Sequence, residues 1–222
     1  PKTDSVKGIM VLVHGIGSCK EAFVELANKL QQRNIAVFIF DLRAHGKSQG
    51  EYCTYGYYEK HDIEVITSKI KSIYPNKPIG IWGSSLGGAV AIQAMEIDSK
   101  IDFGVIECTF TSLEKIVFDY QKRILFGIGF RSMTNKALEK AGEIANFNPG
   151  EVNPLNSVKN ITQPVLIAHG DKDENISYEY GEMLFDSLKS SYKVFVPVAG
   201  AGHNYLHKIG GIDYEEEVLI KI

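Results

Sequence analysis

The alternation of continuous apolar runs with amphipathic stretches constrains the fold of this chain more than any other feature. Six apolar runs of strand length occur at residues 8–15, 35–43, 78–85, 103–110, 164–170 and 192–200. Helix-like stretches lie between them, for example residues 20–34 and 57–74, with apolar residues recurring on one face. Runs without polar alternation are typical of strands covered on both faces. The order predicts an α/β fold with a mainly parallel, doubly wound sheet of about six strands and helices on both faces.

Polar residues gather where the predicted strands end. In open parallel sheets, ligands bind beyond the carboxyl ends of the strands. The polar residues that follow the six runs are His14, Asp41 to Ser48, Ser85, Glu107, His169 to Asp173 and Gly200 to His203. We therefore expect a functional site at this edge of the sheet.

The chain length of 222 residues is sufficient for one large α/β domain, and we expect a single domain over residues 1–222. The connection from Ser112 to Gln163 is longer than the others. It contains two helix-like stretches separated by glycines and then a predicted loop at residues 148–157. Residues 112–160 are expected to form either a small cap insertion or an ordinary crossover with a long loop.

Charge and cysteine usage narrow the function classes. The net charge is −3, and the Lys and Arg residues are scattered along the chain, which argues against a nucleic-acid partner. Cys19, Cys53 and Cys108 are far apart and outside any CxxC pair, so neither a disulfide framework nor a zinc site is expected. A reducing, cytoplasmic location is predicted, unless a signal or anchor segment was omitted ahead of Pro1. The oligomeric state stays open.

Two glycine-rich turns look like nucleotide-binding motifs but lack a required residue. Gly15-Ile16-Gly17 follows the first run, yet Lys20 occupies the third glycine position of G-x-G-x-x-G, where a long side chain obstructs helix–strand packing. Residues 46–48 end like a P-loop, but Asp41 replaces the first glycine and would repel phosphate. Dinucleotide and nucleoside triphosphate sites are therefore excluded, and no cofactor or metal is expected.

The segment 83–87, Gly-Ser-Ser-Leu-Gly, matches the G-x-S-x-G nucleophile elbow. In this motif a serine sits on a sharp turn from strand to helix, and the flanking glycines avoid clashes as the helix folds back. The spacing selects Ser85 as the nucleophile and leaves Ser84 as a small residue at a permissive position.

A serine hydroxyl needs a histidine to accept its proton and a carboxylate to orient that histidine. His203, after the turn Gly200-Ala201-Gly202, is the predicted base. Asp173 is favoured as the acid over Asp171, and Glu107 is a further candidate because it could approach the same histidine. His207 is interpreted as a partly exposed helix residue, and His45 is a less favoured base than His203.

The tetrahedral intermediate of acyl transfer needs two N–H donors aimed at its oxyanion. The backbone N–H of Leu86, at the start of the helix that follows the elbow, is predicted to be one of them. Ile16 N–H, in the loop after the first strand, is predicted to be the other, with Gly17 N–H as the alternative. His14 is expected to hydrogen-bond loop backbone, and Asp41 and Arg43 to fix neighbouring loops.

Together these motifs resemble the α/β-hydrolase superfamily. The segments HGIG, DLRAHGKS, GSSLGG, HGDKD and GAGH occur in family order between about Val11 and His203. Two features depart from the family pattern. ENIS, at residues 174–177, replaces the common Val-Pro of the acid loop, and the usual first antiparallel strands have no counterpart ahead of Gly8. The resemblance implies the triad Ser85, Asp173 and His203 in an α/β-hydrolase fold that lacks those first strands.

The resemblance is closest to small serine esterases and acyl-thioesterases with little cap, including hydrolases that remove lipids from acylated proteins. It implies cleavage of a carboxylic ester or thioester through an acyl-enzyme on Ser85, with a small-molecule or lipid-like substrate. Phe110, Phe118 and Phe126 are candidates to line an acyl pocket. A peptidase or acyltransferase with the same triad, and a non-catalytic binding domain that keeps the fold, are the alternatives.

Overall fold

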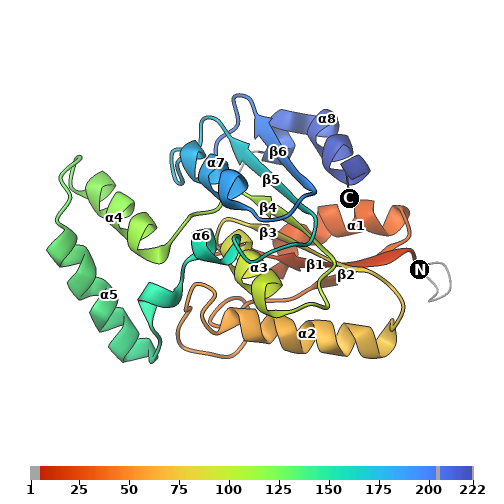
Figure 1. Cartoon of the computed structure of the whole chain (residues 1–222), viewed down its shortest axis with the longest axis horizontal. Helices are drawn as coiled ribbons and strands as arrows, with labels where there is room; N and C mark the ends of the chain where they lie inside the picture. The colour runs from red at the N-terminus through yellow and green to blue at the C-terminus, as the bar shows by residue number, and fades with distance from the viewer. Residues whose placement is uncertain (1–5, 204–205, 222) are drawn as a thin grey trace.

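A parallel sheet forms the centre of the computed structural model, which describes residues 6–203 and 206–221 (Figure 1). The strand order is β2-β1-β3-β4-β5-β6, and every neighbouring pair is parallel. The strands are β1 (Gly8–Val13), β2 (Ile35–Ile39), β3 (Ile79–Ser84), β4 (Phe103–Glu107), β5 (Val165–Gly170) and β6 (Lys193–Val198). The predicted α/β fold and six-stranded parallel sheet are confirmed.

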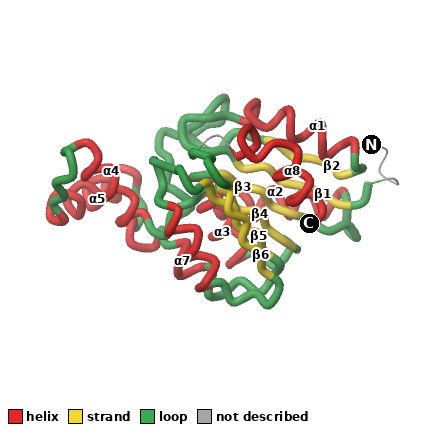
Figure 2. The backbone as a smooth tube through the Cα atoms, turned by 90° about the horizontal axis from the view of Figure 1, so that it is seen from above, coloured by secondary structure: helices red, strands yellow, loops and turns green. Residues whose placement is uncertain are grey.

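Helices cover both faces of this sheet (Figure 2). One layer contains α1 (Val24–Gln32) and α8 (Leu206–Lys221). The other contains α2 (Glu59–Ile73), α3 (Leu86–Ile97) and α7 (Tyr178–Ser187). Side chains of β1 alternate between the two cores, since Val11 packs with the second layer and Leu12 with the first. This double coverage is the physical reason why the strands are apolar without interruption.

Most strands end before the predicted runs do. β2 ends at Ile39 rather than at residue 43, and β4 ends at Glu107 rather than at residue 110. The predicted helix 20–34 is a short 3-10 helix, η2 (Lys20–Phe23), followed by α1. The residues beyond the strands form the loops of the candidate site.

The long connection forms a helical hairpin, α4 (Leu113–Ile124) and α5 (Arg131–Ala145), which contact each other and project from the sheet body (Figures 1 and 2). The loop predicted at residues 148–157 instead contains η3 (Pro149–Glu151) and α6 (Pro154–Ser157). Each begins where an Asn side chain accepts a backbone N–H, Asn148 from Gly150 and Asn153 from Asn156. The cap predicted at residues 112–160 stays a prediction.

The strand order places the ends of β1 and β3 at a topological switch point. From β1 the chain goes to β2 on one side and then crosses to β3 on the other. The loops after the two strands therefore diverge and leave a crevice, which is where open α/β sheets bind ligands. These loops carry Ile16 and Ser85, two of the predicted site residues.

Candidate active site

Ser85 occupies a strained backbone conformation between β3 and α3, with φ +57° and ψ −119°. This region is unfavourable for a residue with a side chain and persists only where the surroundings enforce it. Ser85 N–H donates to the Glu107 carbonyl at 2.8 Å, and Thr109 Oγ1 donates to the Ser85 carbonyl at 2.7 Å. Both backbone groups are thus held from the β4 side, in the sharp turn that the motif predicts.

The glycines around Ser85 are required by close backbone approach. A Cβ atom on Gly83 would lie 2.1 Å from the Gly87 carbonyl oxygen, and one on Gly87 would lie 1.9 Å from the Val13 carbonyl oxygen. The missing side chain at Gly83 lets α3 fold back over β3, and the missing side chain at Gly87 lets α3 pass against β1. The backbone contacts at these two positions therefore explain why the motif has a glycine two residues before and two residues after the serine.

Replacing Gly87 with Ala is expected to lower the free energy of unfolding by about 3 kcal/mol, because the new methyl group meets main-chain atoms that cannot rotate away. Urea denaturation of the variant measures this loss. Gly150→Ala is the matched control, since the nearest neighbour of its Cβ would be the Asn148 Oδ1 atom at 3.3 Å. Equal stability of the two variants would show that the turn adapts and that the contact does not matter.

The structure brings three predicted residues into one hydrogen-bonded chain. His203 Nε2 lies 2.9 Å from Ser85 Oγ, and His203 Nδ1 lies 2.8 Å from Asp173 Oδ2. The Asp173 side chain is fully buried, and the His203 side chain is 10 % exposed. With Nδ1 donating to the carboxylate, Nε2 is free to accept the serine proton, which is the arrangement that general-base activation of a serine requires.

The other Asp173 oxygen, Oδ1, accepts the backbone N–H groups of Asn175 at 2.8 Å and Ile176 at 2.9 Å. Burial raises the pKa of this carboxyl, but hydrogen bonds from His169, His203 and Ile176 outweigh burial and hold the pKa well below its ordinary value. Asp173 is therefore ionised at neutral pH. Asp171, the alternative acid, instead accepts the N–H of Gly200 at 2.6 Å and ties the loop after β6 to the end of β5.

His169 is a buried neighbour of Asp173 for which the sequence indicated no role. Its Nε2 atom lies 3.0 Å from the Ile176 carbonyl oxygen and 3.3 Å from Asp173 Oδ2, and its side chain is fully buried. The signal available in the sequence was its position at the end of β5, four residues before the acid. His169 therefore supports both the acid and the loop that carries it.

Among the described residues, Cys108, His169 and Asp173 form the one cluster with the spacing of a metal site, their ligand atoms lying within 4.8 Å of one another. Burial raises the pKa of the Cys108 thiol well above its ordinary value, so the thiol stays protonated and is a poor metal ligand. Both Asp173 oxygens also accept hydrogen bonds already. We therefore assign this cluster to the support of Asp173, and the predictions of no metal and no cofactor stay predictions.

The two predicted oxyanion donors lie beside Ser85. Leu86 is the first residue of α3, and Ile16 lines the same cavity as Ser85. Within the described part of the chain, neither backbone N–H has a hydrogen-bond acceptor. The Ile16 loop lies against the serine, since a Cβ atom on Gly15 would be in van der Waals contact with the Cβ of Ser85 at 3.4 Å. Unpaired donors next to the serine can bind a developing oxyanion.

His14 holds the Ile16 loop in place. Its Nε2 atom accepts the Leu42 N–H at 3.0 Å, and its Nδ1 atom lies 2.8 Å from the Gly15 carbonyl, to which it donates. Burial lowers the pKa of His14, which favours the neutral imidazole that this pair of bonds requires. His14 therefore hydrogen-bonds loop backbone, as predicted.

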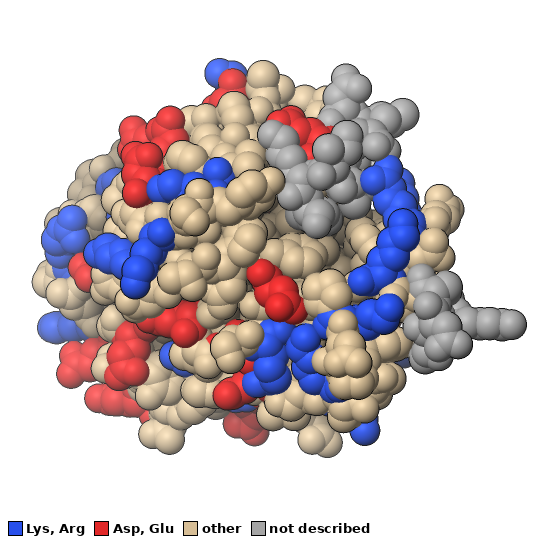
Figure 3. Space-filling model, turned by 45° about the vertical axis from the view of Figure 1, so that its right-hand side comes forward, with Lys and Arg blue, Asp and Glu red and all other residues tan. Residues whose placement is uncertain are grey.

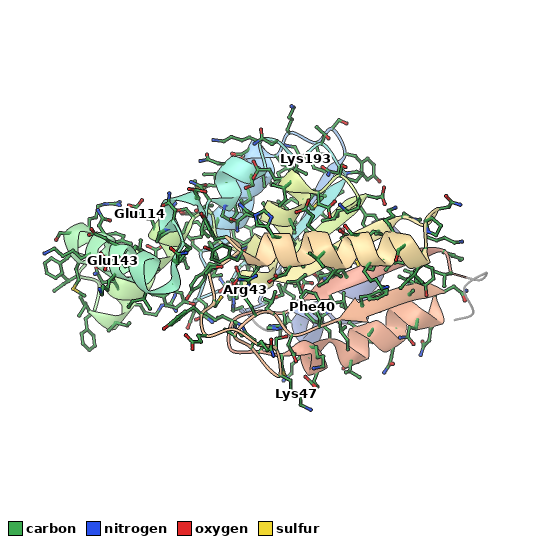
Figure 4. The ribbon with its side chains drawn as sticks, turned by 90° about the horizontal axis from the view of Figure 1, so that it is seen from below. Phe40, Arg43, Lys47, Glu114, Glu143 and Lys193 are labelled. Carbon is green, nitrogen blue, oxygen red and sulfur yellow. The ribbon has the colours of Figure 1, made fainter. Side chains whose placement is uncertain are left out.

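The 41–48 loop is fixed by charged residues, as predicted (Figure 4 labels Arg43 and Lys47). Asp41 accepts Lys20 Nζ at 2.6 Å, Lys20 N–H at 2.8 Å and Lys47 N–H at 3.0 Å. The hydrogen bonds from Lys20 and Lys47 hold the pKa of Asp41 well below its usual range. Arg43 makes a bidentate pair with Asp62 at 2.7 and 2.8 Å.

The prediction for Glu107 requires a correction. Glu107 approaches His207 rather than His203, with His207 Nε2 3.1 Å from Glu107 Oε1, and Tyr214 Oη also donates to that carboxylate. His207 therefore contacts a buried carboxylate, and it is a partly exposed residue of α8, as predicted, with a side chain that is 35 % exposed. Burial raises the pKa of Glu107, but the charge of His207 and hydrogen bonds from His207 and Tyr214 lower it overall.

A cavity of about 390 Å³ opens beside Ser85 and His203. Its apolar lining includes Ile16, Phe23, Tyr120 and Leu206. The three aromatic residues predicted to line an acyl pocket, Phe110, Phe118 and Phe126, are not among the residues that line this cavity. Phe110 is buried where α4 joins the body, Phe118 lies on α4 under Lys122 and Arg131, and Phe126 is 98 % exposed at the hairpin tip.

Comparison with known proteins supports this fold and places the chain in a family. Residues 4–129, more than half of the chain, match the Hydrolase_4 family, described as serine aminopeptidase, S33. Human Protein ABHD12B is 28 % identical over 216 residues, which cover 90 % of this chain and 57 % of the relative. The chain spans about half the length of the curated relatives that it matches first.

Two solved structures share the architecture. An esterase of Pyrococcus furiosus, Pf2001, aligns with a TM-score of 0.78 at 22 % identity, over 97 % of this chain and 82 % of that one. A monoacylglycerol lipase of Paleococcus ferrophilus aligns with a TM-score of 0.73 at 22 % identity, over 97 % of this chain and 94 % of that one. These two structural similarities show the fold. The family match shows the membership in the α/β-hydrolase superfamily that the motifs predicted. The chain belongs to the Hydrolase_4 family of the α/β-hydrolase superfamily.

Proposed function

We propose that this chain is a serine hydrolase that cleaves carboxylic ester or thioester bonds through an acyl-enzyme on Ser85. The observation that carries the proposal is the hydrogen-bonded chain from Ser85 through His203 to Asp173, next to unpaired N–H groups at Ile16 and Leu86. A nucleophile and a base that line one cavity, an acid that orients the base, and oxyanion donors beside the nucleophile form a complete set for acyl transfer.

In the proposed cycle, Ser85 Oγ attacks the substrate carbonyl carbon while His203 Nε2 takes the serine proton. The N–H groups of Ile16 and Leu86 bind the oxyanion of the tetrahedral intermediate. The intermediate collapses to an acyl-enzyme, and His203 gives its proton to the departing alcohol or thiol. A water molecule then attacks the acyl carbon while His203 again acts as the base. This step releases the carboxylic acid and restores the Ser85 hydroxyl.

The cavity favours an ester over an aminopeptidase substrate. An aminopeptidase has to bind the charged α-ammonium group of its substrate, for which a carboxylate is the natural partner. Glu107 is the one carboxylate among the described residues that line the cavity, and it already binds His207 and Tyr214. An apolar acyl or alkyl group instead fits beside Ile16, Phe23 and Leu206.

The names of similar structures agree with this choice, since one is an esterase and another a monoacylglycerol lipase. A small-molecule or lipid-like ester is therefore the proposed substrate, and an acylated protein is the alternative from the same chemistry.

We further propose one hydrolase domain, with the α4–α5 hairpin as a small cap. A cytoplasmic location stays a prediction.

Hydrolysis of a chain-length series of p-nitrophenyl esters and matching thioesters tests this function. We expect cleavage of short and medium acyl chains, with kcat/KM rising with chain length until the acyl group outgrows the cavity. An aminoacyl p-nitroanilide is the comparison substrate and is expected to react far more slowly. Faster cleavage of the anilide than of every ester would show that the chain is a peptidase, and cleavage of no substrate would favour a binding domain.

A further inference from the structure

The tip of the α4–α5 hairpin, residues 124–133, exposes a concentrated apolar surface. Among the described residues, five of the fifteen exposed large apolar side chains lie in this segment: Ile124 (72 % exposed), Phe126 (98 %), Ile128 (58 %), Phe130 (53 %) and Met133 (51 %). Scattered apolar residues are normal on a protein surface, whereas a contiguous patch indicates a binding surface. The predicted acyl-pocket residue Phe126 thus belongs to a surface that the proposed function does not use.

The tip is a defined loop rather than loose chain. Gly127 N–H donates to the Lys122 carbonyl at 2.7 Å, and Phe130 N–H donates to the buried Gln121 side chain at 2.6 Å. Phe126 itself has φ +52°, a left-handed conformation that costs energy for a residue with a side chain. The loop therefore holds the Phe126 ring in water, although burying that ring would be favourable.

The base of the hairpin is anchored to the body while the tip is bare. Tyr180 Oη donates to Asp119 of α4, and Tyr58 Oη donates to the carbonyl of Asn146 at the end of α5. Buried Leu113 and Ile116 also join the apolar cluster that underlies the hairpin. Figures 2 and 4 show the hairpin, on which Figure 4 labels Glu114 and Glu143, projecting from the body. The apolar surface thus lies at the far end of a helical hairpin whose base is held to the body by hydrogen bonds and apolar packing.

The charges around the tip have one sign. Residues 120–138 contain Lys122, Arg123, Arg131 and Lys136 but no Asp or Glu. The hairpin segment 112–147 holds six basic and four acidic residues and so carries +2, in a chain of net charge −3. Three of these cations also have partners toward the base: Lys122 pairs with Asp119 at 2.9 Å, Arg131 pairs with Glu114 at 3.4 Å, and Arg123 donates to the Asn175 side chain and carbonyl at 3.0 and 2.9 Å. The face drawn in Figure 3, in contrast, intersperses both signs.

We propose that the hairpin tip docks this protein on the surface of an anionic phospholipid membrane. An apolar tip surrounded by cations is the combination that enters the boundary between headgroups and acyl chains and attracts anionic lipid. Tyr120, one helical turn before Ile124, lines the cavity beside Ser85, so the helix that carries the tip also forms part of the cavity wall. No helix in the described ranges is long and apolar enough to cross a membrane.

Vesicle flotation with the whole chain tests the proposal. The vesicles are pure phosphatidylcholine in one set and phosphatidylcholine with phosphatidylglycerol in the other. We expect binding to the mixed vesicles that weakens with added salt, and at least about tenfold weaker binding to the neutral ones. The double variant Phe126→Ser/Ile128→Ser is expected to reduce the partition coefficient on mixed vesicles by about tenfold or more. Lys136→Glu is expected to reduce it on mixed vesicles alone.

Val65→Ser on α2 is the matched control, because Val65 is 70 % exposed but lies on a helix of the sheet body. It is expected to bind like the wild type, and melting temperatures verify that all variants fold. Binding is also measured on Ser85→Ala, so the result does not depend on the proposed function. Three outcomes overturn the proposal: no binding to the mixed vesicles, equal binding by the tip variant, or a wild-type dimer that the tip variant abolishes without any vesicle binding.

Discussion

Ser85→Ala is expected to lower kcat/KM for an activated ester by about 10⁴-fold to 10⁶-fold, as deletion of the nucleophile does in serine hydrolases. The variant keeps His203, Asp173 and the N–H groups of Ile16 and Leu86, so binding and oxyanion stabilisation remain while the attacking atom is lost. Steady-state hydrolysis of a p-nitrophenyl ester measures the change. Removing one atom leaves the turn glycines and the backbone bonds to Glu107 and Thr109 in place, and folding should be retained.

Ser84→Ala is the internal control for this prediction. Ser84 is the last residue of β3 and the immediate neighbour of Ser85, but His203 Nε2 hydrogen-bonds to Ser85 Oγ. A fluorophosphonate probe should therefore label the wild type and Ser84→Ala and leave Ser85→Ala unlabelled. Labelling that survives in Ser85→Ala and disappears in Ser84→Ala would move the nucleophile by one position.

The sequence predicted the parallel sheet and the hydrogen-bonded side chains of Ser85, His203 and Asp173. Both depend on features that can be recognised in short segments of the chain. An uninterrupted apolar run is needed wherever helices cover both faces of a strand, as Val11 and Leu12 show. A glycine is needed wherever a Cβ atom would meet backbone, as at Gly83 and Gly87. The order of strands then brings their carboxyl ends to one edge, whatever the details of packing.

The contacts of Glu107 with His207 and Tyr214 could not be predicted, because they depend on how distant elements pack. His207 and Tyr214 reach Glu107 from α8, about 100 residues later in the chain, and no local pattern specifies that contact. Phe126 illustrates the same limit. An apolar residue in a long connection reads equally as core, pocket or exposed surface, and the turn that exposes it is set by the backbone of the hairpin.

Replacing Asp173 with Asn is expected to reduce kcat by about 10⁴-fold with little change in KM, because the substitution imposes the wrong histidine tautomer. The N–H groups of Asn175 and Ile176 both point at the Oδ1 position, so the amide oxygen has to occupy it. The amide NH₂ then faces His203 Nδ1, 2.8 Å from the present Oδ2 position, and donates to it. His203 must carry its own proton on Nε2, where it can no longer accept the proton of Ser85.

The same geometry separates Asp173 from Asp171, the acid that the sequence left open. Asp171→Asn keeps an amide oxygen that can accept the Gly200 N–H and loses only the charge, so it is expected to reduce kcat by less than about tenfold, since no bond to His203 changes. Because the pKa of Asp173 is held well below its ordinary value, the carboxylate stays ionised throughout the weakly acidic range, and loss of wild-type activity there should not follow Asp173 protonation. Measured kcat values for both variants between pH 5 and 9 test the assignment. A greater loss in Asp171→Asn would contradict it, since of these two carboxylates it is Asp173 that contacts the His203 imidazole.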